Sequence, residues 1–300
     1  MSGGRDSTTA RVPRERRPGI GPRDPQQIYR WLMVPAAALV LVAYVVPIAR
    51  VLLISVTEPS LGLANYEFIL TSPAIRRVIG TTLRIATITS ALALVLGYLL
   101  AYVLVSLEAR WQRLLLFALL VPFWLSVLVR AFAWLALLRS GGVINSALIG
   151  VGAIETPLRL VYNEIGVTIG MVHYMTPYAV FVLYAQMQGI DRRLCDAARG
   201  LGARSTQIFR RVWLPLSLPG VAAAAILIFI FSLGFYVTPT LLGAGKTIMV
   251  AEYINVQVSH TLRWGIATAL ATVLLITVGL LVFVLSRVIR VDKLLGTSGA

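Results

Sequence analysis

Charged residues are scarce in this chain of 300 residues. Asp, Glu, Lys and Arg make up 13% of the sequence, whereas hydrophobic residues make up 58% and the mean hydropathy is +0.84. Soluble domains typically have about 25% charged residues. The composition therefore excludes an ordinary soluble domain and predicts an integral membrane protein.

Cysteine and histidine are nearly absent. Cys195 is the single cysteine, so the sequence excludes an intrachain disulfide and a cysteine-based metal cluster. The two histidines, His173 and His260, are too far apart in sequence to form a local ligand motif. We predict no metal site and expect each histidine to pack or hydrogen-bond among helices.

Catalytic and nucleotide-binding motifs are also missing. The sequence has no G-x-x-x-x-G-K-[ST], because GAGKT at 243–247 lacks the first glycine at the required spacing. It has no H-E-x-x-H or G-x-S-x-G either, which disfavours an intramembrane enzyme. We therefore predict no catalytic residue and no cofactor bound by this chain.

Long apolar runs dominate the rest of the sequence. A helix needs about 20 apolar residues to cross a bilayer, and the runs lack the alternation of transmembrane barrel strands. We predict an all-α, polytopic membrane protein with a transmembrane domain over 31–290 and flanking tails at 1–30 and 291–300. The six predicted spans lie near 31–56, 79–107, 111–138, 165–189, 214–235 and 264–289.

Arginine and lysine gather in alternate connections between these spans. The rich segments contain Arg5, Arg11, Arg14, Arg16, Arg17, Arg23, Arg30, Arg110, Arg113, Arg192, Arg193, Arg199, Arg204, Arg210, Arg211, Arg287, Arg290 and Lys293. The other connections, 57–78, 139–164 and 236–263, hold Arg76, Arg77, Arg139, Arg159, Lys246 and Arg263. This bias predicts that both termini face the cytoplasm. It explains the net charge of +15 without nucleic-acid binding, and the tail at 1–30 is predicted to be disordered.

One polar segment, DAARGLGARSTQIFRRVWLP at 196–215, interrupts the apolar runs. We predict two short helices joined at Gly202, where a positive φ suits glycine. Asp191 is expected to cap the first helix, and the second is expected to run from Ser205 and stop before Pro215. Helical spacing places four apolar residues on one face of the first helix: Leu194, Ala197, Ala198 and Leu201.

The order of residues in this segment resembles the EAA loop of ABC-importer permeases, the inner-membrane components of binding-protein-dependent transport systems. The matching positions are Asp196, Ala197, Ala198, Gly202, Val212, Leu214 and Pro215. Asp196 replaces the more usual glutamate, a shortening by one methylene. The alternative interpretation is an ordinary basic loop on anionic lipid headgroups, which explains the arginines but not this order.

Other stretches, at 122–138, 141–148 and 236–254, are similar to the spermidine/putrescine branch, and within it to the first permease component. Branches for opines, phosphonates, thiamine or ferric iron have similar permeases and stay open as alternatives. An ion-coupled secondary transporter is a further alternative, but it would need a repeat and intramembrane acids, and neither is evident.

The resemblance implies a complete ABC importer in the bacterial inner membrane. The chain would pair with a second permease, and ATPase subunits on the cytoplasmic side would bind ATP and Mg²⁺. A periplasmic binding protein would deliver the solute, which passes by alternating access. The cytoplasmic loop at 191–212 would couple the permease to the ATPase.

Polar and aromatic residues in and near the spans are candidates for the solute path: Trp124, Arg130, Trp134, Tyr174, Tyr178 and Tyr236. Arg130 has an alternative role, since an arginine can snorkel to the outer interface beside aromatic anchors. The alternative role of the tyrosines is packing between helices or anchoring at the membrane interface. A polyamine would favour carboxylates and aromatic faces. The predicted spans contain almost no acids, so we expect the binding protein to set selectivity. Three external acids are candidates for contact with the binding protein or solute: Glu155, Glu164 and Glu252.

Overall fold

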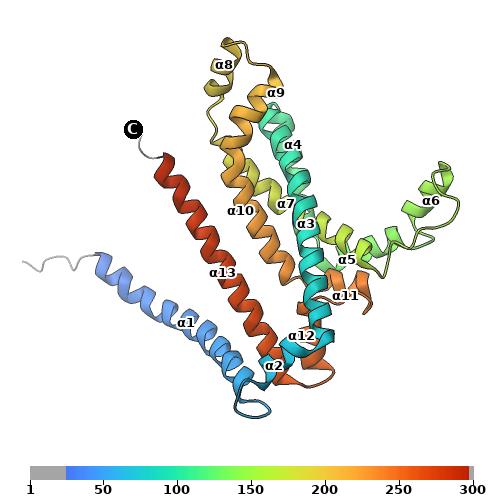
Figure 1. The fold of residues 1–300 in the computed structure, drawn as a ribbon. Helices are drawn as coiled ribbons and strands as arrows, with labels where there is room; N and C mark the ends of the chain where they lie inside the picture. The colour runs from blue at the N-terminus through green and yellow to red at the C-terminus, as the bar shows by residue number, and fades with distance from the viewer. Residues whose placement is uncertain (1–24, 297–300) are drawn as a thin grey trace, which may run out of the picture. The chain divides into compact units, whose positions relative to one another are not determined.

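The structure is a computed structural model that describes the backbone of residues 25–296 and the side chains of residues 33–35 and 37–287. All elements in this range are helices (Figure 1). The chain divides into two compact units, residues 1–49 and 50–300, which are described separately.

Helix α1 (Pro25–Thr57) contains the first unit's described residues and extends into the second unit. Its residues 25–30 are helical, so the prediction of a disordered tail is wrong for these positions. Proline is favoured in the first turn of a helix because its missing N–H needs no partner there. The rest of the predicted tail, residues 1–24, lies outside the described residues.

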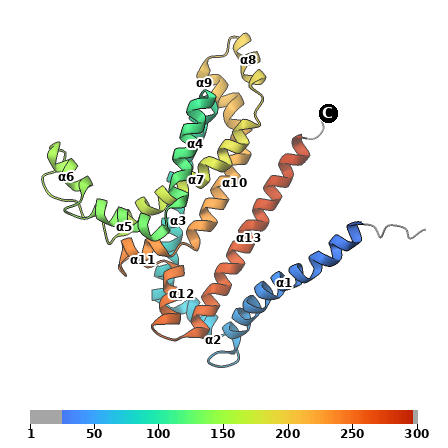
Figure 2. The ribbon, with the colours of Figure 1, turned by 180° about the vertical axis from the view of Figure 1, so that it is seen from behind.

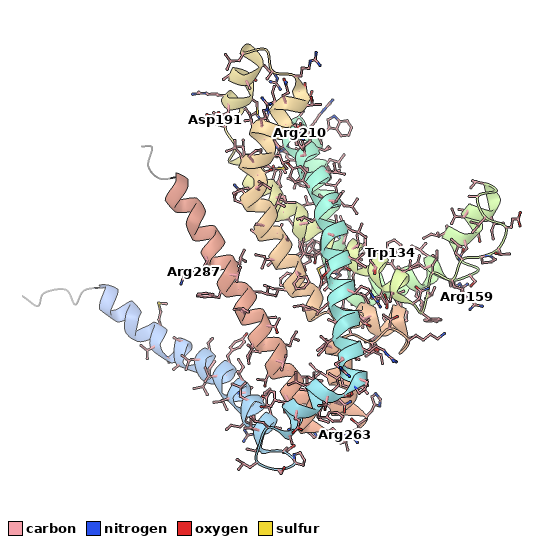
Figure 3. All side chains as sticks on the ribbon, in the orientation of Figure 1. Trp134, Arg159, Asp191, Arg210, Arg263 and Arg287 are labelled. Atoms are coloured by element: carbon pink, nitrogen blue, oxygen red, sulfur yellow. The ribbon has the colours of Figure 1, made fainter. Side chains whose placement is uncertain are left out.

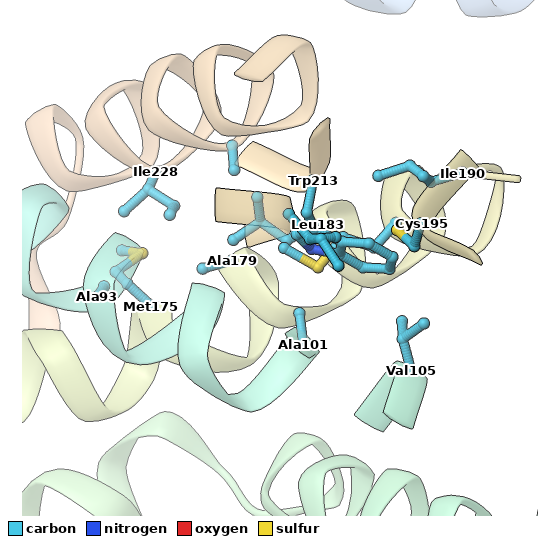
Figure 4. Packing of buried hydrophobic residues seen from close by; sticks show 13 residues of the cluster. Ala93, Ala101, Val105, Met175, Ala179, Leu183, Ile190, Cys195, Trp213 and Ile228 are labelled. Atoms are coloured by element: carbon cyan, nitrogen blue, oxygen red, sulfur yellow. The ribbon is translucent and has the colours of Figure 1, made fainter. Parts of the chain in front are cut away.

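Three long helices form the centre of the second unit: α3 (Pro73–Ser106), α7 (Glu164–Gln188) and α10 (Leu214–Leu233) (Figures 1 and 2). A Cβ atom on Gly97 of α3 would lie 2.4 Å from the Cβ of Ala179 in α7, so glycine allows these helices to approach closely. The main core, shown in Figure 4, comprises Ala93, Ala101, Val105, Met175, Ala179, Leu183, Met187, Ile190, Cys195, Ile208, Trp213, Ala224 and Ile228.

The predicted fold class is confirmed. Six helical segments are long and apolar enough to cross a membrane, and the described residues 25–296 contain no strand. The six segments are Met33–Thr57, Pro73–Ser106, Val127–Gly150, Glu164–Gln188, Ser205–Leu233 and Trp264–Arg287.

The stretch 111–138 is not one helix, so the predicted third span is wrong in its bounds. It is divided between α4 (Ala109–Trp124) and α5 (Val127–Leu138). Pro122 removes one helical hydrogen bond. Ser126 then starts a new helix, because its Oγ accepts a hydrogen bond from the backbone nitrogen of Leu128 at 3.3 Å. The segment that is long and apolar enough to cross the membrane runs from Val127 through α6 (Val143–Gly150).

Short helices complete both ends of the second unit. At one end, α2 (Ala64–Thr71) and α12 (Val250–Ser259) pack against α13 (Trp264–Gly296), and α11 (Val237–Gly243) packs against α5 and α7. At the opposite end lie α8 (Arg192–Gly200) and α9 (Ser205–Ile208) (Figures 1 and 2). Helix α13 extends to Gly296, so residues 291–296 of the predicted C-terminal tail 291–300 are helical. Residues 297–300 lie outside the described part.

Candidate functional site

The predicted coupling loop at 191–212 and the motif residues up to Pro215 together form residues 191–215, called the coupling segment after that prediction. This segment begins with a capped helix. The side chain of Asp191 accepts a hydrogen bond from the backbone nitrogen of Arg193 at 2.9 Å, which confirms the predicted N-cap of α8. Figure 3 places Asp191 and Arg210 at the same end of the second unit. Because the Asp191 side chain supplies this hydrogen bond, the start of α8 is determined by a residue next to it in the sequence.

Gly202 ends α8 by the predicted left-handed turn. Its φ is +83°, and nothing lies within 4 Å of a Cβ atom built on it. The nitrogen of Gly202 donates to the Arg199 carbonyl at 2.9 Å, and the nitrogen of Ala203 donates to the Ala198 carbonyl at 3.0 Å. These two bonds form a Schellman motif. Backbone conformation, rather than lack of space, therefore favours glycine at this position.

The inner face of α8 is attached to the bundle. Cys195 is 7% exposed and belongs to the main core, and Figure 4 shows it beside Trp213. Ala198 is half-buried against the same core. Arg192 donates a hydrogen bond from Nη2 to the carbonyl of Val105 in α3. Packing and this hydrogen bond fix α8 to the end of α3.

The outer face of α8 carries exposed apolar residues. Leu194 is 49% exposed, Leu201 is 90% exposed, and Ala197 is also exposed. The four apolar residues predicted to share one helix face differ in exposure, because Ala198, at i+3 from the buried Cys195, packs toward the bundle. Ala197 and Ala198 thus lie in different environments although they are adjacent in sequence.

The motif's acidic residue forms an ion pair within α8. Asp196 Oδ1 lies 2.6 Å from Nη1 of Arg199, with the side chains 66% and 64% exposed. Exposed i,i+3 pairs contribute little stability, about 0.2–0.5 kcal/mol. Asp196 is thus accessible on the surface of α8.

The second helix does not stop before Pro215, contrary to the prediction. Residues 205–233 are one continuous helical rod, with a π-helical turn at Phe209–Trp213 between α9 and α10. The nitrogen of Leu214 donates to the Phe209 carbonyl in the wider π pattern, and Pro215 follows where its missing N–H falls within the first turn of α10. Val212 and Leu214 are half-buried, whereas Pro215 is exposed.

Aromatic rings join this rod to α3. The ring of Tyr102 lies edge-on to Phe209 and to Trp213, with centroids 5.6 Å apart in both pairs. Nearby, the hydroxyls of Tyr98 and Ser217 are 3.0 Å apart. A cavity of about 420 Å³ lies between α8, the π-helical turn and α3. The coupling segment is thereby connected to two helices of the bundle.

The structure brings together three of the predicted solute-path residues. The guanidinium carbon of Arg130 lies 4.2 Å from the ring centre of Tyr174, and Tyr178 stacks on Tyr174 with centroids 5.9 Å apart. Phenylalanines that were not among the predicted residues extend this group. We call the combined surface the aromatic strip: Phe123, Tyr174, Tyr178, Phe231 and Phe235.

The other predicted solute-path residues are not among the rings that pack against Tyr174 or Tyr178 in the described part of the chain. Trp124 is 90% exposed. Trp134, labelled in Figure 3, packs edge-on against His173 with centroids 5.5 Å apart. The hydroxyl of Tyr236 accepts a hydrogen bond from Nδ2 of Asn255 at 3.1 Å. The aromatic strip therefore includes two of the five predicted aromatic residues.

The predicted external acids differ in their surroundings. Glu164 pairs with Arg84, and Glu155 is exposed. Glu252 is 5% exposed, and its Oε2 has no hydrogen-bond partner among the described residues, so burial raises the pKa of this carboxyl. The side chain of Glu252 is therefore largely shielded from the surface, unlike that of Glu155. In the part of the chain that the structure describes, no three His, Cys, Asp or Glu residues gather as a metal site.

Related sequences match most of this helical region. Residues 93–291 match the family described as binding-protein-dependent transport system inner membrane component. The spermidine/putrescine transport system permease protein PotB of Escherichia coli is 34% identical over 228 residues, 76% of this chain and 82% of that protein. The protein of the same name from Haemophilus influenzae is 32% identical over 216 residues, 72% of this chain and 76% of that one.

Solved structures show the same fold. A chain of a bacterial alginate ABC transporter, in complex with an alginate-bound periplasmic protein, matches with a TM-score of 0.75 and 15% identity, covering 92% of this chain and 98% of that one. A chain of the MetNI methionine ABC transporter matches with a TM-score of 0.52 and 17% identity, covering 74% and 98%. The present chain is a multi-pass inner-membrane protein, and it belongs to the family of inner membrane components of binding-protein-dependent transport systems.

Proposed function

We propose that this chain is a permease subunit of an ATP-driven ABC importer for polyamines. It works with a second permease, separate ATPase subunits that bind ATP and Mg²⁺, and a periplasmic binding protein. The observation that carries the coupling role is the division of α8 into an exposed face and a face fixed to the bundle.

The exposed face of α8 docks on the ATPase. Leu194, Ala197 and Leu201 supply apolar surface for a groove on the partner, and the small Ala197 lets the partner approach closely. Apolar surface of this kind supports protein association when it is covered. Asp196 and Arg199, an exposed pair on another side of α8, offer hydrogen bonds to the partner.

Movement of the ATPase passes into the membrane helices as a rigid-body displacement. A Schellman turn of a few residues joins α8 to the rod 205–233, which contains α10. Arg192 and the main core attach α8 to α3 as well. A push on α8 therefore reaches α3 and α10 together and changes access to the solute path.

The coupling segment and both termini face the cytoplasm in this proposal. The exposed arginines Arg193, Arg204, Arg210 and Arg211 all lie within residues 191–215, and positive charge in short connections favours the cytoplasmic side. This orientation places α8 where ATP is available.

Polyamine is the proposed solute because PotB, the relative that is 34% identical, is named a spermidine/putrescine permease. The aromatic strip supports this choice, since aromatic faces attract ammonium groups. The scarcity of acids in the spans makes the path weakly binding, so selectivity belongs to the binding protein.

Reconstituted transport tests the proposal. The chain, its second permease and the ATPase are placed in proteoliposomes with ATP inside, and labelled spermidine is supplied on the binding protein. We expect uptake that requires ATP, the binding protein and this chain. Uptake of a different solute under the same requirements would overturn the polyamine assignment and leave the importer role. Uptake driven by an ion gradient without ATP would overturn the importer role.

A further inference from the structure

Arg130 of α5 rests on an aromatic face instead of an acidic partner. Its guanidinium carbon is 4.2 Å from the centre of the Tyr174 ring in α7. Its Nε is buried and has no hydrogen-bond partner among the described residues. The ion pairs found in that part of the chain belong to other arginines: Arg84, Arg110 and Arg199. The Tyr174 ring is therefore the principal stabilising contact of this cation.

Tyr174 is the point where the aromatic strip meets this positive charge. Its ring packs against Phe235 with centroids 4.7 Å apart and stacks on Tyr178 at 5.9 Å. Tyr178 in turn contacts Phe123 of α4 at 5.0 Å and Phe231 of α10 at 5.3 Å. The strip thus joins three helices, with Arg130 above one of its rings.

A guanidinium and an alkylammonium seek the same feature of a tyrosine ring, the negative face of its quadrupole. Two cations on one ring also repel each other, and this repulsion is strong away from bulk water. If a polyamine passes along the strip, its ammonium group and Arg130 compete for Tyr174.

We propose that Arg130 is a tethered competitor that displaces the polyamine from Tyr174 and so keeps the solute path weakly binding. This role depends on the proposed polyamine function. The solute takes the ring while Arg130 swings aside, and the return of Arg130 releases the solute. Arg130 is therefore a residue that sets the affinity of the path, and it needs no acidic partner to do so.

Removal of the charge tests this role through binding itself. The purified complex of this chain, the second permease and the ATPase is titrated with labelled spermidine in the absence of the binding protein. We expect Arg130→Gln to lower Kd about threefold to thirtyfold, the range that corresponds to one cation–π contact. Arg130→Lys keeps the charge and should bind like the wild type. In proteoliposomes, Arg130→Gln should lower the maximal uptake rate because release slows.

Two controls assign the effect to the Tyr174 ring. Arg139→Gln removes an exposed charge directly after α5 and should leave Kd unchanged. Adding Tyr174→Leu to Arg130→Gln should abolish the gain in affinity, whereas adding Tyr174→Phe should preserve it. If Arg130→Gln does not assemble with its partners, Arg130→Met provides the same loss of charge.

The outcomes separate this role from the proposed function. An unchanged or higher Kd in both charge-removing variants, or a gain that survives Tyr174→Leu, would overturn the role of Arg130. Spermidine uptake by the wild-type transporter reports on the function independently. Absent uptake overturns the polyamine function, whereas normal uptake with an unchanged Kd in the variants overturns only the competitor role.

Discussion

The coupling segment and the aromatic strip are built in opposite ways. The coupling segment is continuous in sequence, and local hydrogen bonds set its helix ends at Asp191 and Gly202. The aromatic strip joins Phe123, Tyr178 and Phe231 from three helices, and tertiary packing alone brings them together. Under the proposed function, force enters through a locally encoded element, whereas the proposed solute surface exists only in the folded bundle.

Substitution of Gly202 should impair the coupling segment strongly and leave the aromatic strip intact. Gly202→Val should cost about 1–2 kcal/mol or more locally, because a β-branched residue is strained at a φ of +83°. We expect loss of the Schellman turn, at least tenfold lower uptake and reduced copurification of the ATPase. Spermidine binding by the permease should persist because the aromatic strip is untouched.

Gly200→Val is the matched control for this substitution. Gly200 is the last residue of α8, and a Cβ atom there also meets nothing within 4 Å, but its φ is not in the left-handed region. Normal ATPase copurification and uptake in Gly202→Val would show that α8 does not couple the two proteins.

Gly97 lies where α3 packs against α7, and both the coupling segment and the aromatic strip depend on these helices, so a larger residue there should destabilise the bundle. Gly97→Ala should lower the free energy of unfolding by about 1–3 kcal/mol, since the new Cβ would lie 2.4 Å from that of Ala179. Gly80→Ala in the same helix meets nothing within 4 Å and should be neutral or stabilising by about 0.5–1 kcal/mol. Thermal unfolding in detergent compares the two variants. Equal melting temperatures would contradict the close packing of α3 on α7.

Removing the N-cap of α8 tests whether this local hydrogen bond or the tertiary packing keeps the helix folded. Asp191→Ala should destabilise α8 by about 1 kcal/mol, because the nitrogen of Arg193 loses its acceptor. Hydrogen exchange should increase in residues 192–200 and stay unchanged in α7. Asp191→Asn, which keeps an acceptor, should behave like the wild type. Equal protection of α8 in the alanine variant would show that tertiary contacts suffice.

Glu252 gives the smallest expected effect and lies outside both regions. Burial raises the pKa of this carboxyl in the folded state above its ordinary value of 4.5. The folded protein then holds the proton more tightly than the unfolded chain, so this stabilisation is present below about that ordinary value and is lost as pH rises through the raised pKa. Glu252→Gln should melt at a higher temperature than the wild type at pH 8 and nearly the same temperature at pH 4.5. A wild-type advantage at pH 8 would contradict this sign.

The coupling segment was largely predictable because its signals are local. Gly202 stands where a Schellman motif needs a residue with positive φ, and Asp191 is a common capping residue. The buried face of α8 was not predictable, since helical spacing allowed several apolar faces and contact with Trp213 selected that of Cys195. The continuation of the helix through Pro215 depends on the π-helical turn, for which the sequence offered no clear signal.

The aromatic strip was predictable only in part. Tyr174, Tyr178 and Phe181 at i, i+4 and i+7 indicate an aromatic face on one helix. Phe123 of α4 and Phe235, in the connection between α10 and α11, reach this face only through tertiary packing. The break between α4 and α5 had a local signal in Pro122 and Ser126, although the surrounding apolar run suggested one span.

Accessibility of the outer face of α8 is the most direct test of the proposed coupling. Cys195 is buried, so it is first replaced by alanine, and Leu201→Cys then places a thiol at a position that is 90% exposed. A membrane-impermeant maleimide should label this thiol in inside-out vesicles and not in right-side-out vesicles, and the bound ATPase should protect it. Labelling from the outside, or equal labelling with and without the ATPase, would contradict the account.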